Sequence, residues 1–110
     1  MIKGPYYLIG RAREKDVFLT KHALEMVRKR KIPTSKLLDA IRYPWKILKD
    51  AQHSSPIPGF HRRVYVSKKN ELIVIVDEDS MIIIVTSWKK TKDLEEFISK
   101  RVERGIWVEE

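Results

Sequence analysis

The sequence predicts a single α+β domain in which a helical hairpin is followed by an antiparallel β-meander and a C-terminal helix. Three patterns predict this fold. Two segments with helical spacing lie in residues 20–44, apolar residues alternate with a period of two in residues 45–86, and helical spacing returns after Thr91. The length of 110 residues fits one compact domain, which we place at residues 1–110.

The predicted helical hairpin follows two short β-prone segments, residues 6–9 and 17–19. Thr20 is a typical helix N-cap, Pro33 predicts the start of a second helix, and Pro44 predicts its end. Apolar residues follow each start at helical spacing: Ala23, Met26 and Val27 in the first helix, and Leu37, Leu38 and Ile41 in the second. We expect these side chains to face the core.

The β-meander is predicted from four segments, residues 45–48, 61–67, 72–76 and 81–85. The last two segments are apolar on both faces, so we expect them to be central strands that are covered on both sides. The acidic residues Asp77, Glu78 and Asp79 lack the ligand spacing of a calcium loop. We therefore predict that they turn the chain between these two strands.

The last helix is predicted to begin at Thr91, as its N-cap, and to end at Gly105. Its buried stripe is expected to consist of Leu94, Phe97, Ile98 and Val102. The tail at residues 106–108 is too apolar for a free end. We therefore expect it to pack on the domain or on a partner.

The positive charge is concentrated in the first half of the chain. The whole chain carries a net charge of +8. Residues 1–63 hold 15 Lys and Arg and 5 Asp and Glu, a net charge of +10, whereas residues 64–110 hold 8 and 10, a net charge of −2. This asymmetry favours a surface that binds a polyanion such as nucleic acid. The alternative is a solvated, ion-paired surface of the kind found in heat-adapted proteins.

The segment Thr20-Lys21-His22-Ala23, followed by Arg30-Lys31-Ile32, resembles the opening of the domain-of-unknown-function family 4258. Arg62-Arg63-Val64-Tyr65 and residues 71–86 match that family's basic strand and β-hairpin, so the similarity covers roughly residues 18–88. Met26 and Lys31 stand where the family has arginine and glycine. The family resembles the RelE/ParE-like toxins. That resemblance implies a RelE-like core at about residues 18–104, RNA cleavage, and an acidic antitoxin as partner.

His61, Arg63 and Tyr65 are the first candidates for chemistry, because alternation places them on one face of a strand. RNA cleavage by attack of a 2′-hydroxyl group needs a base, an acid for the departing 5′ oxygen, and cations for the phosphorane charge. These three side chains supply such groups, and the tyrosine ring also stacks on a base. The alternative is an ordinary exposed polar face of an antiparallel sheet.

His22 is the second candidate, in the opening turn of the first predicted helix. Free backbone N–H groups and the helix dipole favour a phosphate there and keep the imidazole ring neutral. The alternative is a histidine that only forms a local hydrogen bond at the start of a helix. Together with the resemblance, this position predicts a catalytic set of His22, His61, Arg63 and Tyr65, with the two histidines as base and acid.

The nucleic-acid backbone is expected to bind lysines and arginines near a groove. The predicted backbone-binding residues are Lys21, Arg28, Lys29, Lys31, Arg62, Lys89 and Lys90. Arg30 has the helical spacing of the buried stripe, so we expect it to bury its stem or to pair with an acid.

The chain contains no cysteine, which excludes disulfides and thiolate metal sites, and we expect no metal or cofactor. No apolar stretch of signal-peptide or membrane-spanning length follows the N-terminus, so we expect a cytoplasmic protein without a membrane partner. The sequence thus predicts a metal-independent endoribonuclease, the toxin of a toxin–antitoxin pair, that cuts free or ribosome-bound RNA. Two alternatives are a non-catalytic RNA- or DNA-binding module and a protein-interaction subunit.

Overall fold

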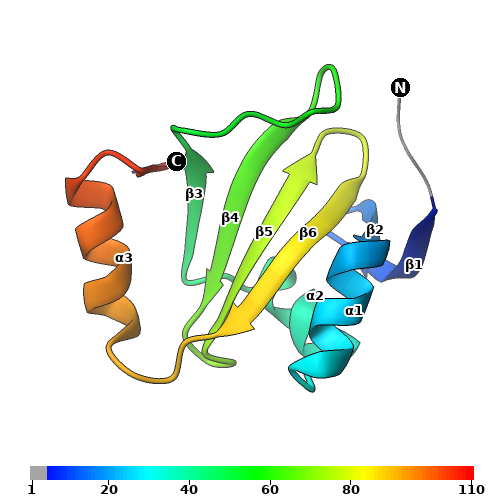
Figure 1. The fold of residues 1–110 in the computed structure, drawn as a ribbon, viewed down its shortest axis with the longest axis horizontal. Coiled ribbons are helices and arrows are strands. Elements are labelled where there is room, and N and C mark those ends of the chain that lie inside the picture. The colour runs from blue at the N-terminus through cyan, green and yellow to red at the C-terminus, as the bar shows by residue number, and fades with distance from the viewer. Residues whose placement is uncertain (1–4) are drawn as a thin grey trace.

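The computed structural model describes residues 5–110 and shows a mixed seven-stranded sheet with three helices in this part of the chain (Figure 1). In chain order the elements are β1 (Tyr6–Ala12), β2 (Lys15–Thr20), α1 (Lys21–Lys29), α2 (Thr34–Arg42), β3 (Lys46–Asp50), β4 (His61–Ser67), β5 (Leu72–Glu78), β6 (Ile82–Lys89), α3 (Leu94–Glu103) and β7 (Trp107–Glu109). Across the sheet the strands follow the order β1-β2-β6-β5-β4-β3-β7.

The predicted order of elements, a RelE-like helical hairpin followed by an antiparallel meander and a last helix, is wrong. The described part of the chain, residues 5–110, begins with an antiparallel hairpin of β1 and β2, so the helices do not come first. β2 also pairs in parallel with β6, which makes the sheet mixed, and β7 pairs with β3 at the other edge. The partner of Val17 is Ile82. A pairing between residues so far apart in the chain leaves no trace in a local sequence pattern.

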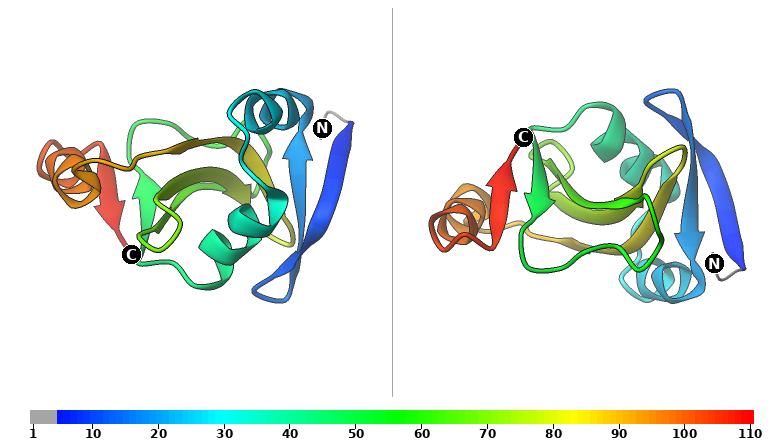
Figure 2. Two further views of the ribbon diagram at one scale, coloured as in Figure 1. Left: turned by 90° about the horizontal axis from the view of Figure 1, so that it is seen from below. Right: turned by 90° about the horizontal axis from the view of Figure 1, so that it is seen from above.

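Each face of the sheet carries an apolar core. The first core lies against α1 and α2 and includes Ala23, Val27, Leu37, Ile41, Tyr65, Val74, Val76 and Ile84. The second core lies against α3 and includes Leu48, Val64, Val66, Ile73, Ile98 and Trp107. Figure 2 shows α3 at the end of the molecule opposite the β1–β2 hairpin. The prediction that residues 72–76 and 81–85 form strands with two covered faces is therefore confirmed.

The helix ends follow from single residues. The side-chain oxygen of Thr20 accepts a hydrogen bond from the backbone N–H of Ala23 at 3.0 Å, which confirms the predicted N-cap of α1. The prediction that Thr91 caps α3 is wrong, because α3 begins at Leu94. Asp93 precedes that helix in the left-handed conformation, with φ 56°, and makes no side-chain cap hydrogen bond.

The β1–β2 hairpin lies close to α2 because of one glycine. Gly10 has a φ of +151°, and β1 has an irregularity in its pairing at this point. A Cβ atom built on Gly10 would lie only 2.9 Å from Leu38 Cδ1. Glycine thus lets the strand approach the helix closely, which fixes the hairpin beside the sheet face that α2 also covers.

The apolar tail at residues 106–108 packs on the domain itself, which is one of the two arrangements that the sequence predicts, the other being packing on a partner. Trp107 is buried, and its ring lies edge-on to that of Phe97, with the ring centres 6.2 Å apart. β7 therefore joins both the sheet and the second core.

Within residues 5–110, every helix is too short or too polar to cross a membrane.

Candidate functional site

Four side chains converge at the end of β5, and we call Lys15, Arg63, Tyr65 and Glu78 the Glu78 cluster. Glu78 is only 3% exposed although it is acidic. Its Oε1 atom accepts a hydrogen bond from the Tyr65 hydroxyl at 2.5 Å, and its Oε2 atom accepts one from Lys15 Nζ at 2.8 Å. Arg63 Nη1 lies 3.3 Å from the same Oε2 atom. These partners offset the cost of removing a carboxylate from water.

The strand order explains why these residues meet. Arg63 and Tyr65 lie two positions apart in β4 and so share a face, and Glu78 lies on that face of the neighbouring strand β5. Lys15 is the first residue of β2, which enters the sheet beside β6. His61 is the direct cross-strand partner of Glu78 and is exposed to solvent. The site therefore draws on β2, β4 and β5.

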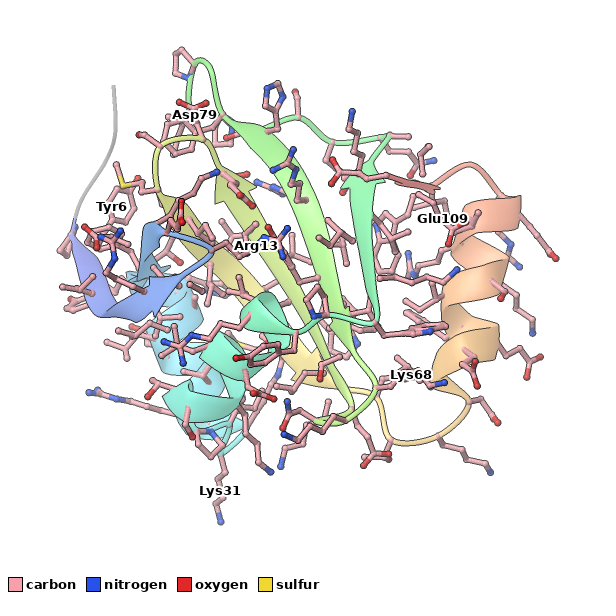
Figure 3. All side chains as sticks on the ribbon, turned by 180° about the vertical axis from the view of Figure 1, so that it is seen from behind. Tyr6, Arg13, Lys31, Lys68, Asp79 and Glu109 are labelled. Atoms are coloured by element: carbon pink, nitrogen blue, oxygen red, sulfur yellow. The ribbon has the colours of Figure 1, made fainter. Side chains whose placement is uncertain are left out.

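A shallow hollow of about 520 Å³ opens over the Glu78 cluster, lined by Arg13, Glu14, Lys15, Arg63 and Glu78. Figure 3 shows Arg13 reaching from the β1–β2 turn toward the middle strands of the sheet. Its guanidinium carbon lies 5.7 Å from the centre of the Tyr65 ring. The hollow thus has a buried carboxylate at its base, and three cations and the carboxylate of Glu14 on its walls.

The charge state of the cluster follows from burial and from its ion pairs. Burial alone would raise the pKa of Glu78, but hydrogen bonds from Lys15 and Tyr65 and the charges of Lys15 and Arg63 bring it below its ordinary value. Burial and the hydrogen bond to Glu78 raise the pKa of Tyr65 well above its ordinary value. Burial would lower the pKa of Arg63, but Glu78 and Glu110 raise it. At neutral pH the site therefore holds a carboxylate, a neutral phenol and a guanidinium.

Acid is expected to destabilise the protein through Glu78. The folded-state pKa of Glu78 lies below its ordinary value of 4.5. The stabilisation from this group is therefore complete above pH 4.5 and is lost as the pH falls through the folded-state pKa. Urea unfolding of the wild type and of Glu78→Gln from pH 7 to pH 3 checks this expectation. The difference in unfolding free energy should shrink toward low pH, and a constant difference would contradict the assignment.

Of the predicted catalytic residues, the structure brings His61, Arg63 and Tyr65 onto one face. The expectation that the Tyr65 ring is available to stack on a base is wrong, because Tyr65 is 1% exposed and belongs to the core under α2. Its hydroxyl group instead holds Glu78. Tyr65 is thus a positioning residue of the cluster.

His22 is not brought to this site. β2 carries the chain from Lys15, which contacts Glu78, to Thr20, a rise of about 16 Å. His22 follows Thr20 in the first turn of α1 and is exposed. His22 is not among the residues that line the hollow, and a catalytic role of His22 stays a prediction.

The predicted backbone-binding residues fall into separate places. Lys21, Arg28, Lys29 and Lys31 are exposed on α1 or just after it, and Lys89 and Lys90 follow at the end of β6. Figure 3 shows Lys31 pointing away from the molecule at the end far from Arg13. Arg30, which we expected to bury its stem or pair with an acid, is exposed and donates a hydrogen bond from Nη1 to the backbone oxygen of Ser87 at 2.6 Å.

Arg62 lies on the opposite face of the sheet from Arg63. Its Nε atom donates a hydrogen bond to Asp77 Oδ1 at 2.6 Å, and Asp77 is buried. Of the three acidic residues predicted to lie in a turn, Asp79 follows β5 as predicted, but Asp77 and Glu78 belong to β5 and pair with arginines on opposite faces.

Sequence reasoning missed Glu78, Lys15 and Arg13 as site residues. A signal for Glu78 was present, because it continues the period-two pattern of Val74 and Val76 on one face of β5. Lys15 and Arg13 had no comparable signal, since charged residues around a turn are common on protein surfaces.

The donor atoms at the site suit phosphate more than a metal ion. Within residues 5–110, no three histidine, aspartate or glutamate side chains lie together in a group that could hold a metal.

Comparisons with family models, curated proteins and solved structures gave no significant match. The resemblance to family 4258 therefore stays an expectation from the sequence.

Proposed function

We propose that the protein is a metal-independent endoribonuclease that cuts RNA at the Glu78 cluster. One observation carries this proposal: a buried carboxylate, held by a tyrosine and two cations, lies at the base of a solvent-open hollow. Ionisable groups with shifted pKa values that gather in a hollow are frequent at active sites. The positive lining suits a phosphate diester, and the carboxylate suits proton transfer.

The cluster and His61 supply the parts of a 2′-hydroxyl attack. Glu78 accepts the proton of the 2′-hydroxyl group while the O2′–P bond forms. Lys15 and Arg63 neutralise the charge of the phosphorane. The bond between phosphorus and the 5′ oxygen then breaks, and the imidazolium of His61 gives its proton to that oxygen. The products are a 2′,3′-cyclic phosphate and a 5′-hydroxyl group.

Substrate binding would also make Glu78 a stronger base. Lys15 and Arg63 are among the groups that lower its pKa. A phosphate that draws these cations toward itself weakens their hold on the carboxylate, so the pKa of Glu78 rises as the substrate enters.

His61 lies beside Glu78 across the two strands, with Cβ atoms about 5 Å apart for such a pair. His61 does not line the hollow itself, but this spacing would let it act as the acid beside the base Glu78.

Cleavage of end-labelled RNA in EDTA tests the proposal. We expect the wild type to cut, and His61→Ala to cut about 10²-fold more slowly, because the departing oxygen loses its acid. His53→Ala is the matched control, since His53 is an exposed histidine that contacts Asp50 outside the hollow. Its rate should equal that of the wild type. Absence of cleavage with both free and ribosome-bound RNA would overturn the proposal.

The same proposal makes the protein the cytoplasmic toxin of a toxin–antitoxin pair. The support is the sequence resemblance together with the positive lining of the hollow, which an acidic antitoxin segment would cover. Co-purification with a small acidic protein that blocks cleavage would support this part.

A second candidate is a non-catalytic RNA-binding module. The specific observation in its favour is that both carboxylate oxygens of Glu78 already accept hydrogen bonds. A purely structural ion-pair network has this form. This candidate predicts RNA binding that weakens steeply with salt, without any cleavage.

A further inference from the structure

We propose that Arg13 binds the phosphate of the RNA substrate, and that the fold is less stable because an arginine occupies this turn position. The inference rests on the proposed function for the identity of the ligand. Phosphate binding by Arg13 can, however, be measured separately from cleavage.

The conformation of the β1–β2 turn does not favour an arginine. Arg13 and Glu14 connect the two strands, and both have positive φ values, 54° and 65°. A two-residue hairpin turn with two left-handed residues strongly prefers asparagine, aspartate and glycine. In other residues the Cβ atom crowds the backbone in this conformation. The geometry of the turn therefore gives no reason for an arginine at position 13.

The charge of Arg13 is not bound in an ion pair, although Glu14 and Glu78 line the same hollow. In the part of the chain that the structure describes, Arg13 forms no ion pair, although it lines the hollow. The other cations of this region are paired: Lys15 and Arg63 with Glu78, and Arg11 with Asp16 at 2.7 Å. The guanidinium of Arg13 instead lies over the Tyr65 ring. Its N–H groups are therefore available to an anion that enters the hollow.

A phosphate diester fits this arrangement. A guanidinium group donates two parallel hydrogen bonds to phosphate oxygens, which fixes both position and orientation. Tyr65 supports the guanidinium from below and is itself held by Glu78, so the phosphate would lie next to the carboxylate. Unfavourable backbone conformations cluster at ligand clamps, where the surrounding structure holds them in place.

Arg13→Asn is the test variant, because asparagine suits the left-handed conformation. We expect its melting temperature to rise by about 4 °C. Its affinity for a fluorescein-labelled oligonucleotide with a 2′-deoxy sugar at every position, which cannot be cut, should fall about tenfold, and the salt slope should fall by about one phosphate contact. A purely structural role on the Tyr65 ring predicts the opposite pair, a lower melting temperature and unchanged affinity.

Arg11→Gln is the matched control, since it removes one positive charge from the same hairpin outside the hollow. Its affinity should stay within about twofold of that of the wild type. An equal loss in both variants would overturn the inference, because the effect would then be one of net charge. A lower melting temperature in Arg13→Asn would overturn the stability part.

Three outcomes separate this inference from the proposed function. Oligonucleotide binding that depends on Arg13, without cleavage of RNA by the wild type, supports the inference and overturns the nuclease. Cleavage by the wild type with Arg13-independent binding overturns the inference alone. Stabilisation by inorganic phosphate that requires Arg13, without oligonucleotide binding, identifies a small phosphate ligand and overturns the assignment to RNA.

Discussion

Glu78→Gln is expected to slow RNA cleavage by at least about 10²-fold while RNA binding is kept or strengthened. The amide cannot accept the proton of the 2′-hydroxyl group, so the proposed base is lost. Removal of the negative charge leaves Lys15 and Arg63 with more positive charge toward the phosphate. A gel-based cleavage assay and an anisotropy titration with a non-cleavable oligonucleotide measure the two effects on the same protein. A variant that cuts at the wild-type rate contradicts the role of Glu78.

The Glu78→Gln substitution is also expected to lower the stability of the fold, and this effect must be separated from the loss of the catalytic base. The substitution leaves Lys15 and Arg63 without their acidic partner, and because their side chains are 30% and 29% exposed, the cost stays below the roughly 3–5 kcal/mol of a fully buried pair. Asp77→Asn provides the matched control, because Asp77 is the preceding residue of β5, is equally buried, and pairs with Arg62 on the opposite face. We expect similar melting temperatures for the two variants, with cleavage lost only in Glu78→Gln. Equal loss of cleavage in both would mean that the fold, and not the carboxylate, was affected.

Trp107→Ala is expected to lower the free energy of unfolding by about 3–5 kcal/mol. The indole ring is 3% exposed, lies against Phe97, and has the Arg101 guanidinium carbon 4.8 Å from its centre. Its loss leaves a cavity in the second core, where α3 and β7 meet the sheet. Small domains are stable by only about 5–15 kcal/mol in total, so this single substitution removes a large share.

Urea unfolding with a common slope checks this value. Val108→Ala is the control, because Val108 is the neighbouring residue of β7 and is 49% exposed. It should cost less than about 1 kcal/mol. Equal effects of the two substitutions would show that β7 contributes through strand pairing and not through the indole ring.

The local elements were predictable where one residue or one short pattern decides them. Thr20 caps α1 because its hydroxyl oxygen accepts a hydrogen bond from the backbone N–H of Ala23, three residues further on. The second helix, α2, ends at Arg42, shortly before Pro44. The hairpin at the start of the chain was seen only as two β-prone segments. Its place in the sheet depends on the parallel pairing of β2 with β6. Most of the chain forms the loop between these two strands, so local residue spacing carries no information about their pairing.

The candidate site was half predictable. Alternation placed His61, Arg63 and Tyr65 on one face, and the structure agrees. Glu78 was predicted to lie in a turn, because it belongs to a run of three acidic residues. The period-two pattern of β5 nevertheless continues to Glu78 and would have placed it in the sheet. Arg13 lies in a turn that lacks the asparagine or glycine by which such turns are recognised. Sequence rules therefore fail at Arg13, the residue to which we assign a functional role by proposal.

The two ion pairs on opposite faces of β4 and β5 also bear on how the sheet assembles. Apolar alternation fixes which face of a strand is buried, but it cannot distinguish pairing registers that differ by two residues. Arg62 lies opposite Asp77 in the native register. A slip of two residues in one direction would set Asp77 opposite Val64, and a slip in the other would set Arg62 opposite Ile75. Either leaves a buried charge without its partner, so this pair selects one register among those that the apolar residues allow.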